Sequence, residues 1–223
     1  MRGRQAAGMS SISSSFWSQS ISWILKRRVR EAFEGSVAWA PHRRQASQVS
    51  MVPNNKSPSS RENDVYNPSS PYSASKASSD HLVKAWFHTY NFPIIITHCS
   101  NNYGPFQNKE KLIPLTIYKL LNKKNIPIYG NGLNIRDWIH VDDHVNALTL
   151  IQRKGKIGQI YNIGSNNEIT NISLVLKICK VFDELFPKNK THKKYITYVK
   201  DRLGHDLRYS LSPKLLKSMG WEP

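Results

Sequence analysis

The residues from about position 61 to the end of the chain predict an α/β fold. Segments with helical spacing alternate there with short β-branched runs. One of these runs, Pro93–Thr97, is apolar without alternation, as expected for a strand buried on both faces of a parallel sheet. The polar loop Ser100–Pro105 follows this strand, at the position where open α/β sheets bind their ligands.

The charge of the chain is positive but not concentrated on its folded part. Of the net charge of +17 over 223 residues, residues 1–60 carry +7, and the lysines of the remainder are scattered. This pattern suits a small anion such as a diphosphate as well as it suits a polyanion, so neither a nucleic-acid partner nor a membrane is predicted. Cys99 and Cys179 are too few for a disulfide scaffold or a metal site, which indicates a reducing, cytoplasmic location.

The first sixty residues differ in composition from the rest of the chain. They are rich in Ser and Arg and contain no acidic residue before Glu31. This composition is typical of an organelle transit peptide, which is the alternative to a cytoplasmic location. We interpret residues 1–60 as a disordered extension without helical or strand periodicity. Residues 61–125 and 126–223 are then predicted to carry the catalytic pair and the substrate-binding domain, respectively.

The first predicted helix begins at Pro71, where the missing N–H costs nothing, and runs to Tyr90. No glycine or proline interrupts it, and Asn91 is expected to end it. Its apolar residues recur near helical spacing and predict a buried stripe of Ala74, Ala77, Leu82, Ala85 and Trp86.

Further helices are predicted by capping residues and helical spacing. They run over Leu112–Leu121, from a cap at Asp142 to about Arg153, from a cap at Asn171 or Ser173 to Phe186, and over Pro213–Met219. The helix that ends at Phe186 is expected to bury Leu174, Leu176, Ile178, Val181, Phe182 and Leu185. Gly220 is expected to stop the last helix.

Three short runs between these helices predict further strands. They cover Ile126–Tyr129, Gln159–Ile163 and Tyr195–Val199. Glycines at 130 and 132 end the first strand, Gly164 ends the second, and the charged loop Asp201–Asp206 follows the third. Helices and strands therefore alternate along the whole segment.

Tyr72 and Lys76 are the candidate catalytic pair. They lie four residues apart, so they share one helix face. A lysine ammonium beside a phenol favours the phenolate, which makes tyrosine a usable base near neutral pH. The spacing alone also fits an ordinary solvated helix face, because many surface helices carry such a pair.

Other polar residues have structural alternatives to a functional role. Arg136 could pair with Asp137 or Asp142, and His205 with Asp206. His140 and His144 have a spacing that binds metal on a continuous helix, but the predicted helix begins between them, so no metal site is predicted. His81 and His98 have no evident ligand partners, and we assign them structural roles.

The sequence around the pair resembles that of one enzyme family. Pro68–Ala77 resembles the active-site segment of extended short-chain dehydrogenases/reductases. Six later segments, in order and spacing, narrow the resemblance to the dTDP-glucose 4,6-dehydratases: Cys99–Pro105, Glu110–Pro114, Pro127–Gly130, Ile135–Trp138, Tyr161–Gly164 and Asp201–His205. The resemblance covers about three quarters of the chain. It implies part of a Rossmann-like parallel sheet followed by a small C-terminal α/β substrate-binding domain.

The resemblance also implies an NAD-dependent lyase reaction. In that family Tyr72 would take the proton of the sugar C4 hydroxyl while C4 gives hydride to NAD. Water then leaves from C6 and hydride returns there, which gives the 4-keto-6-deoxy sugar. Lys76 would hold the nicotinamide ribose. The segment Tyr72, Ser73, Ala74, Ser75 and Lys76, together with Asn102, would contact NAD.

A dTDP-sugar nucleotide is the substrate that the resemblance implies. Asn101 would lie near the sugar, Lys111 and Leu112 near the sugar nucleotide, and Pro127, Ile128 and Tyr129 around the base. Arg136 and Arg202 would grip the diphosphate, a role that suits a planar and permanently charged fork. The pocket would be completed by Asn171, Asp201 and His205. The resemblance leaves a homodimer open.

Several features of the family are absent from this sequence. No glycine occurs between Gly35 and Gly104, so the glycine-rich turn that binds the NAD pyrophosphate is missing. The acidic Asp-Glu pair that the family places upstream of its tyrosine is also missing. Leu203 and Leu207 stand where the family usually has proline and arginine. We therefore expect the chain alone to be inactive, and its unpaired apolar faces to make it associate.

Two other functions are consistent with the sequence. A related UDP-sugar epimerase or dehydratase would normally lack part of the segments at 100–105 and 201–205. A non-catalytic module that binds a nucleotide sugar or another subunit would keep the pocket without the cofactor.

Overall fold

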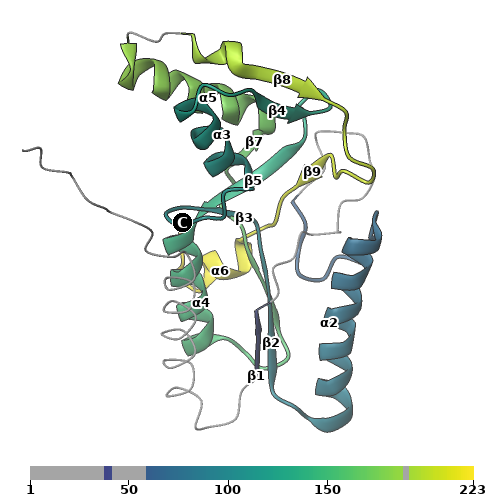
Figure 1. Cartoon of the computed structure of the whole chain (residues 1–223). Coiled ribbons are helices and arrows are strands. Elements are labelled where there is room, and N and C mark those ends of the chain that lie inside the picture. Colours follow the sequence, from purple (N-terminus) through teal and green to yellow (C-terminus); the bar gives the residue numbers. More distant parts are fainter. Residues whose placement is uncertain (1–37, 42–58, 188–190) are drawn as a thin grey trace, which may run out of the picture. The chain divides into compact units, whose positions relative to one another are not determined.

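The structure is a computed structural model that describes residues 38–41, 59–187 and 191–223. Most of the predicted N-terminal extension lies outside these residues. The described residues from Ala38 onward form one unit. Its elements are labelled in Figure 1.

A three-stranded parallel sheet supports the helix that carries Tyr72. Its strands are β1 (Ala38–Pro41), β2 (Ile94–Cys99) and β6 (Ile160–Ile163), in the order β1-β2-β6. All six residues of β2 are buried, which confirms the predicted strand with two residues more at its end. Alternate residues of β2 face opposite sides, so Ile94 and Ile96 pack in one cluster and Ile95 and Cys99 in another.

Helices cover both faces of this sheet (Figure 1). Helix α2 (Pro71–Tyr90) packs on one face, where Val83 and Phe87 contact the cluster of Ile94 and Ile96. Helices α4 (Val141–Lys154) and α6 (Lys214–Ser218) pack on the other. This arrangement is the α/β layering that the sequence predicts.

Helix α2 begins and ends where the sequence predicts. Ser70 caps it by accepting a hydrogen bond from Ser73 N, Pro71 is its first residue, and Asn91 ends it with a left-handed φ of 51°. The predicted buried stripe is mostly wrong, because the side chains of Leu82 and Trp86 are 63% and 57% exposed. The helix instead buries a narrow strip of small and polar residues, Ser73, Ala77 and Asp80.

A buried polar network joins α2 to the sheet. Nε2 of His98 lies 3.0 Å from Oδ2 of Asp80, and its Nδ1 lies 3.2 Å from Oδ1 of Asn162. All three residues are fully buried. Such groups are retained only when their hydrogen bonds are satisfied, so His98 has a structural role. His81 instead packs edge-on against Tyr66.

A second layer forms around the two-stranded parallel sheet of β4 (Ile126–Tyr129) and β8 (Ile196–Val199). Helices α3 (Leu112–Leu121) and α5 (Asn171–Leu185) and the short 3-10 helix η2 (His192–Tyr195) complete it. Its buried cluster consists of Leu120, Ile126, Ile128, Val175, Cys179 and Phe182. Three of the four hydrophobic clusters in the described residues therefore combine residues from both sides of position 125.

The predicted face and cap of α5 require correction. Thr170 caps the helix, not Asn171 or Ser173, by accepting a hydrogen bond from Ser173 N. The residues that it buries are Val175, Cys179 and Phe182, which lie three to four positions apart. Of the predicted stripe, only Phe182 is among them; Ile178 is partly buried against the cluster, and Leu174, Leu176, Val181 and Leu185 are not buried.

Four strands that the sequence analysis missed form a sheet between these layers. They are β3 (Asn101–Tyr103), β5 (Ile135–His140), β7 (Glu168–Thr170) and β9 (Arg208–Tyr209). Strand β5 pairs with all three others, parallel to β3 and β9 and antiparallel to β7. The residues 101–103 are thus a strand and not part of a loop. His140, not Asp142, caps α4, because its ring accepts a hydrogen bond from Asp142 N.

None of the helices in the described ranges is long and apolar enough to cross a membrane. Cys99 and Cys179 are buried, and each lies in a different hydrophobic cluster.

Candidate functional site

A pocket of about 450 Å³ opens where the three groups of strands meet. Its size is within the usual range of small-molecule sites. Among the residues that line it are twelve that the sequence analysis selected: Tyr72, Ser73, Asn101, Asn102, Lys111, Leu112, Pro127, Tyr129, Arg136, Asn171, Arg202 and His205. Residues that are up to 133 positions apart in the sequence are therefore brought to one cavity.

Five selected residues do not line this pocket. Ala74, Ser75 and Lys76 lie on α2 but are not among the residues that line the pocket. Asp201 does not line it either, but it contacts His205, which does. The prediction for Ile128 is corrected, because its side chain is buried in the hydrophobic cluster beneath β4. The reason is the alternation of the strand, which turns Pro127 and Tyr129 to the pocket and Ile128 to the core.

Tyr72 and Lys76 lie together on α2, as the spacing predicts. The Lys76 ammonium is 5.6 Å from the centroid of the Tyr72 ring. The Tyr72 side chain is 52% exposed and lines the pocket, so a ligand there can reach its hydroxyl. The cap at Ser70 fixes the first turn of the helix and thereby the position of Tyr72.

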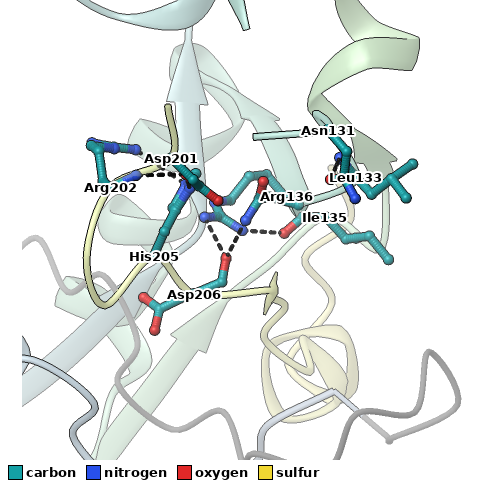
Figure 2. A network of polar contacts seen from close by, with 9 residues as sticks. Asn131, Leu133, Ile135, Arg136, Asp201, Arg202, His205 and Asp206 are labelled. Carbon is teal, nitrogen blue, oxygen red and sulfur yellow. Dashed lines mark hydrogen bonds and ion pairs between the residues drawn. The ribbon is translucent and has the colours of Figure 1, made fainter. Parts of the chain in front are cut away.

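Arg136 lies at the centre of a polar network beneath the pocket (Figure 2). Its Nη1 donates to the carbonyl of Ile135 at 2.7 Å, and its Nη2 donates to the carbonyl of Asp206 at 2.8 Å. The predicted alternative, an ion pair with Asp137 or Asp142, is wrong. Asp137 faces the other side of β5, where it accepts hydrogen bonds from Ser165 and Asn167.

The Arg136 guanidinium is buried, and no carboxylate of the described residues is in direct contact with it. Burial lowers its pKa, the charge of Asp206 opposes that shift, and the charge of Arg202 adds to it. A buried cation that is held only by neutral carbonyls is stabilised by any anion that enters the pocket. The pocket is therefore prepared for a negatively charged group at this point.

A second network holds Arg202 at the rim of the pocket. Nδ1 of His205 is 2.6 Å from Oδ1 of Asp201, and its Nε2 is 3.1 Å from Nη2 of Arg202. The predicted alternative partner of His205, Asp206, is wrong. Burial lowers the pKa of His205, which the hydrogen bond to Asp201 opposes, and the same hydrogen bond lowers the pKa of Asp201. A neutral ring can accept from Arg202, and that hydrogen bond orients the guanidinium.

Gly130 makes room for this network. Its φ is +56°, and an added Cβ would lie 2.8 Å from Oδ2 of Asp201. A side chain at position 130 would therefore be strained and would displace the carboxylate that holds His205. This close approach explains why the residue that follows strand β4 is a glycine.

Asn102 is held by two neighbours on its side of the pocket. Its Nδ2 lies 2.9 Å from Nδ1 of His144, and its carbonyl accepts a hydrogen bond from Gln107 at 2.6 Å. His144 makes one of these contacts, whereas His140 caps α4. Within residues 59–187 and 191–223, no three His, Cys, Asp or Glu side chains gather closely enough to hold a metal ion.

Only some of the residues that were predicted to contact NAD line the pocket. Tyr72, Ser73 and Asn102 do, whereas Ala74, Ser75 and Lys76 do not. The pyrophosphate of a dinucleotide needs closely spaced glycines after a strand, and none of the described strands is followed by such a turn. The described residues therefore do not form a complete NAD site.

The pocket also contains residues that the sequence analysis did not select. They are Ser70, Cys99, Ser100, Gln107, Glu110, Leu115, Trp138, Leu203, Gly204 and Asp206. For two of these residues, the sequence contained a feature that could have identified them. Trp138 follows Arg136 by two residues in a strand, so both side chains lie on one face. Ser100 lies within a segment that carried the family resemblance.

Comparison with protein families gives one match over most of the chain. A model of the family described as GDP-mannose 4,6 dehydratase matches residues 45–223. A dTDP-glucose 4,6-dehydratase from Shigella flexneri is 55% identical over 163 residues, which are 73% of this chain and 45% of that protein. The chain thus spans about half the length of the curated relatives that it matches.

Solved structures show the same relationship. A dTDP-glucose 4,6-dehydratase from Bacillus anthracis in complex with NAD is 38% identical, with a TM-score of 0.71, and the alignment covers 96% of this chain and 66% of that one. DesIV, a dTDP-glucose 4,6-dehydratase from Streptomyces venezuelae with NAD and TYD bound, is 34% identical. Its TM-score is 0.74, and the alignment covers 97% of this chain and 66% of that one.

Proposed function

The chain belongs to the GDP-mannose 4,6 dehydratase family, and from that premise we propose that it is the substrate-binding part of a dTDP-glucose 4,6-dehydratase. The reaction that it would serve converts dTDP-glucose to dTDP-4-keto-6-deoxyglucose and water, which makes the whole enzyme a lyase. The proposal assigns binding of the nucleotide sugar to the pocket described above.

The observation that carries this proposal is the distribution of charge in the pocket. Arg136, Arg202 and Lys111 contribute three cationic residues to its lining, against two acidic residues, Glu110 and Asp206. Arginine forks match the paired oxygens of a diphosphate, and burial of the Arg136 guanidinium strengthens that attraction. A diphosphate at this position is the proposed central anchor of the ligand.

The two ends of the pocket suit the two ends of a nucleotide sugar. Pro127 and Tyr129 offer an apolar and aromatic wall for a base, and the Arg202 guanidinium lies 5.0 Å from the Tyr129 ring centroid. At the other end, the Tyr72 hydroxyl is placed to exchange a proton with a sugar hydroxyl, beside the Lys76 ammonium. We assign Tyr72 the role of base and Lys76 that of its cationic neighbour.

We propose that the chain by itself binds the substrate but not NAD, and does not turn the substrate over. Reversible hydride transfer is the chemistry that NAD supplies in this reaction. The sequence contains neither the glycine-rich turn for the pyrophosphate nor an Asp-Glu pair upstream of Tyr72. The two solved relatives described above are complexes with NAD.

Isothermal titration calorimetry tests this proposal. The purified chain should bind dTDP-glucose and dTDP and should give no heat with NAD. Incubation with NAD and dTDP-glucose should give no product that has lost water, as judged by mass spectrometry. Tight binding of NAD would contradict the incomplete cofactor site, and formation of the 4-keto-6-deoxy product would overturn the proposed inactivity.

Two further assignments are part of the proposal. A related UDP-sugar epimerase is the alternative enzyme, and UDP-glucose binding much tighter than dTDP-glucose would favour it. A homodimer is the proposed assembly. A cytoplasmic location is proposed because two cysteines are too few for a disulfide scaffold, which suits a reducing compartment.

A further inference from the structure

Four exposed lysines lie near one end of the two-stranded sheet, although lysines are scattered along the sequence. Strands β4 and β8 run parallel, and their first residues, Ile126 and Ile196, are partners in the pairing. Each of these residues is preceded, by three and two positions, by a pair of exposed lysines: Lys123 and Lys124, and Lys193 and Lys194. Paired strands lie about 4.7–4.9 Å apart, and three residues of chain span at most about 11 Å. The strand pairing therefore gathers all four lysines at one end of the sheet.

Hydrogen bonds hold the two segments that carry these lysines. The Lys124 amide donates to the carbonyl of Lys119 at 2.8 Å, which closes the turn after α3. Oδ1 of Asp183, on α5, accepts a hydrogen bond from the His192 amide at 2.9 Å and lies 2.6 Å from Nδ1 of the same residue. These contacts fix η2 against α5, so the lysines belong to an ordered part of the fold.

The positive charge at this end of the sheet is not balanced by neighbouring acidic groups. None of the four lysines forms an ion pair with another residue in the described ranges. The sequence of residues 112–132 and 171–200 contains ten lysines and two acidic residues, Asp183 and Glu184. Asp183 is already engaged by His192. An anionic partner would therefore relieve the repulsion among these lysines.

Two large apolar side chains are exposed beside the lysines. Leu121 is 61% exposed and lies two residues before the first lysine, at the end of α3. Phe186 is 44% exposed, and its ring lies 5.6 Å from the ring of Phe182, which is 5.7 Å from that of His192. Phe186 is thus close to the η2 lysines. We call the following six residues the lysine patch: Leu121, Lys123, Lys124, Phe186, Lys193 and Lys194.

The lysine patch and the pocket lie at opposite ends of α3 and α5. The first residues of these helices, Leu112 and Asn171, line the pocket, and none of the patch residues does. At 1.5 Å per residue, the ten residues of α3 and the fifteen of α5 span about 15 and 22 Å. A large partner can therefore occupy the lysine patch while the pocket stays open to solvent.

The composition of the lysine patch favours an anionic membrane surface over a nucleic acid. Clusters of about four to eight basic residues bind acidic phospholipids, and aliphatic or aromatic side chains among them enter the boundary below the headgroups. Nucleic-acid sites instead use arginine forks and flat rings on which bases stack. The patch contains no arginine, and its more exposed apolar side chain is that of Leu121.

We propose that the lysine patch binds the surface of a membrane that contains anionic phospholipids. The four lysines contact the headgroup phosphates, and Leu121 and Phe186 enter the boundary between headgroups and acyl chains. The inference goes beyond the proposed function and does not depend on it, because the patch is separate from the pocket.

Flotation with lipid vesicles tests the proposal and separates bound protein from aggregates, which do not float. The chain should float with vesicles of equimolar phosphatidylglycerol and phosphatidylcholine, and not with phosphatidylcholine alone. Because residues 1–60 also carry positive charge, matched variants locate the binding site. Lys124→Gln combined with Lys194→Gln should weaken binding about 25-fold, roughly fivefold for each lysine. Lys214→Gln combined with Lys217→Gln, at exposed residues of α6, makes the same charge change and should leave binding unchanged.

A fluorescent label at position 121 tests whether the apolar residues enter the bilayer. Cys99 and Cys179 are buried, so a thiol-reactive nitrobenzoxadiazole label should attach to the new cysteine of Leu121→Cys. Its emission should shift to shorter wavelength with the anionic vesicles, because the label leaves water. The same label on Leu133→Cys, which is 58% exposed and follows β4 at its other end, should show no shift.

The outcomes distinguish this proposal from its alternatives and from the proposed function. Equal flotation of both double variants and the unmodified chain, or an unchanged emission of the label at position 121, would overturn it. Binding of poly(U) RNA in place of the vesicles, lost in the Lys124 and Lys194 double variant, would assign the patch to a nucleic acid. Both double variants should unfold at the same urea concentration as the unmodified chain, because their lysines are exposed. Failure to bind dTDP-glucose would contradict the proposed function alone.

Discussion

Nδ1 of His205 lies 2.6 Å from Oδ1 of Asp201, and this hydrogen bond fixes the histidine ring that faces Arg202. The carboxylate holds the proton on Nδ1, so the lone pair of Nε2 points at the Arg202 guanidinium. The arrangement positions one of the two arginines proposed to bind the diphosphate. Asp201 therefore acts on a ligand through His205 and Arg202.

Replacement of Asp201 by Asn should weaken dTDP binding several-fold. The amide can still form a hydrogen bond with the ring, but it no longer stabilises the Nδ1–H form by charge, so Arg202 loses its fixed partner. Calorimetry with dTDP measures the loss. Asp142→Asn makes the same charge change at an exposed residue outside the pocket and should have no effect. Equal affinities of Asp201→Asn and the unmodified chain would show that the network does not orient Arg202.

Arg136→Lys should weaken dTDP binding by about tenfold or more although the charge is kept. The guanidinium donates from two nitrogens to the carbonyls of Ile135 and Asp206, and an ammonium cannot reproduce that fork. Arg153→Lys, in the last turn of α4, is the matched control. A Lys variant that binds dTDP as tightly as the unmodified chain would mean that Arg136 acts as a point charge or not at all.

The stability of the chain should depend on His205 as the pH falls below the ordinary histidine pKa of 6.5. Burial lowers the pKa of His205 from its ordinary value of 6.5, so the unfolded chain binds a proton that the folded chain does not. Stability therefore falls as the pH drops below about 6.5 and stops falling below the folded-state pKa. The lowered pKa of Asp201 acts in a separate window, below its ordinary value of 3.8, where stability is lost on further acidification.

Urea unfolding at several pH values measures this dependence. His205→Asn keeps a donor for Asp201 but does not titrate, so its free energy of unfolding should fall less on acidification. His88→Asn, at the exposed end of α2, should retain the full dependence. A His205→Asn variant with the same pH dependence as the unmodified chain would show that other groups cause it.

The elements with local signals could be predicted from the sequence. Helix α3 and strand β4 have the predicted ends, because apolar spacing and the glycines after β4 mark them locally. Strands β5 and β7 could not be predicted, because polar residues interrupt them. The buried Asp137 is tolerated in β5 only because Ser165 and Asn167, almost thirty residues later, donate to it.

The candidate site was likewise predictable only where the sequence carries a local motif. Sequence motifs selected Tyr72, Arg136 and Arg202, and the structure places all three on one pocket. Motifs could not show that His205 pairs with Asp201 and not with its neighbour Asp206, since that choice depends on the loop conformation. Nor could they show that Lys124 and Lys194 lie at one end of the same sheet, which depends on the pairing of β4 with β8.

Removal of the Asp80 side chain should destabilise the fold by about 1–3 kcal/mol, because it takes the hydrogen-bond partner of a buried ring nitrogen away. Asp80→Ala leaves His98 buried between α2 and β6 without the carboxylate that lies 3.0 Å from its Nε2. Urea unfolding at neutral pH measures the change. Asp142→Ala, at a residue whose side chain is 80% exposed, should stay within about 0.5 kcal/mol. A similarly small change for Asp80→Ala would show that the network does not hold α2 against the sheet.

The outer face of α2 should cause the chain to associate. Leu82, Trp86 and Tyr90 are exposed on it, and the rings of Trp86 and Tyr90 lie 4.9 Å apart at the end of the helix. Apolar surface of this kind favours contact with other copies of the chain. A double variant, Leu82→Lys and Trp86→Lys, should therefore shift the sedimentation velocity profile toward the monomer. Val65→Lys, at an isolated exposed residue, should leave the profile unchanged, because a single apolar side chain forms no patch. An unmodified chain that sediments as a monodisperse monomer would refute the prediction.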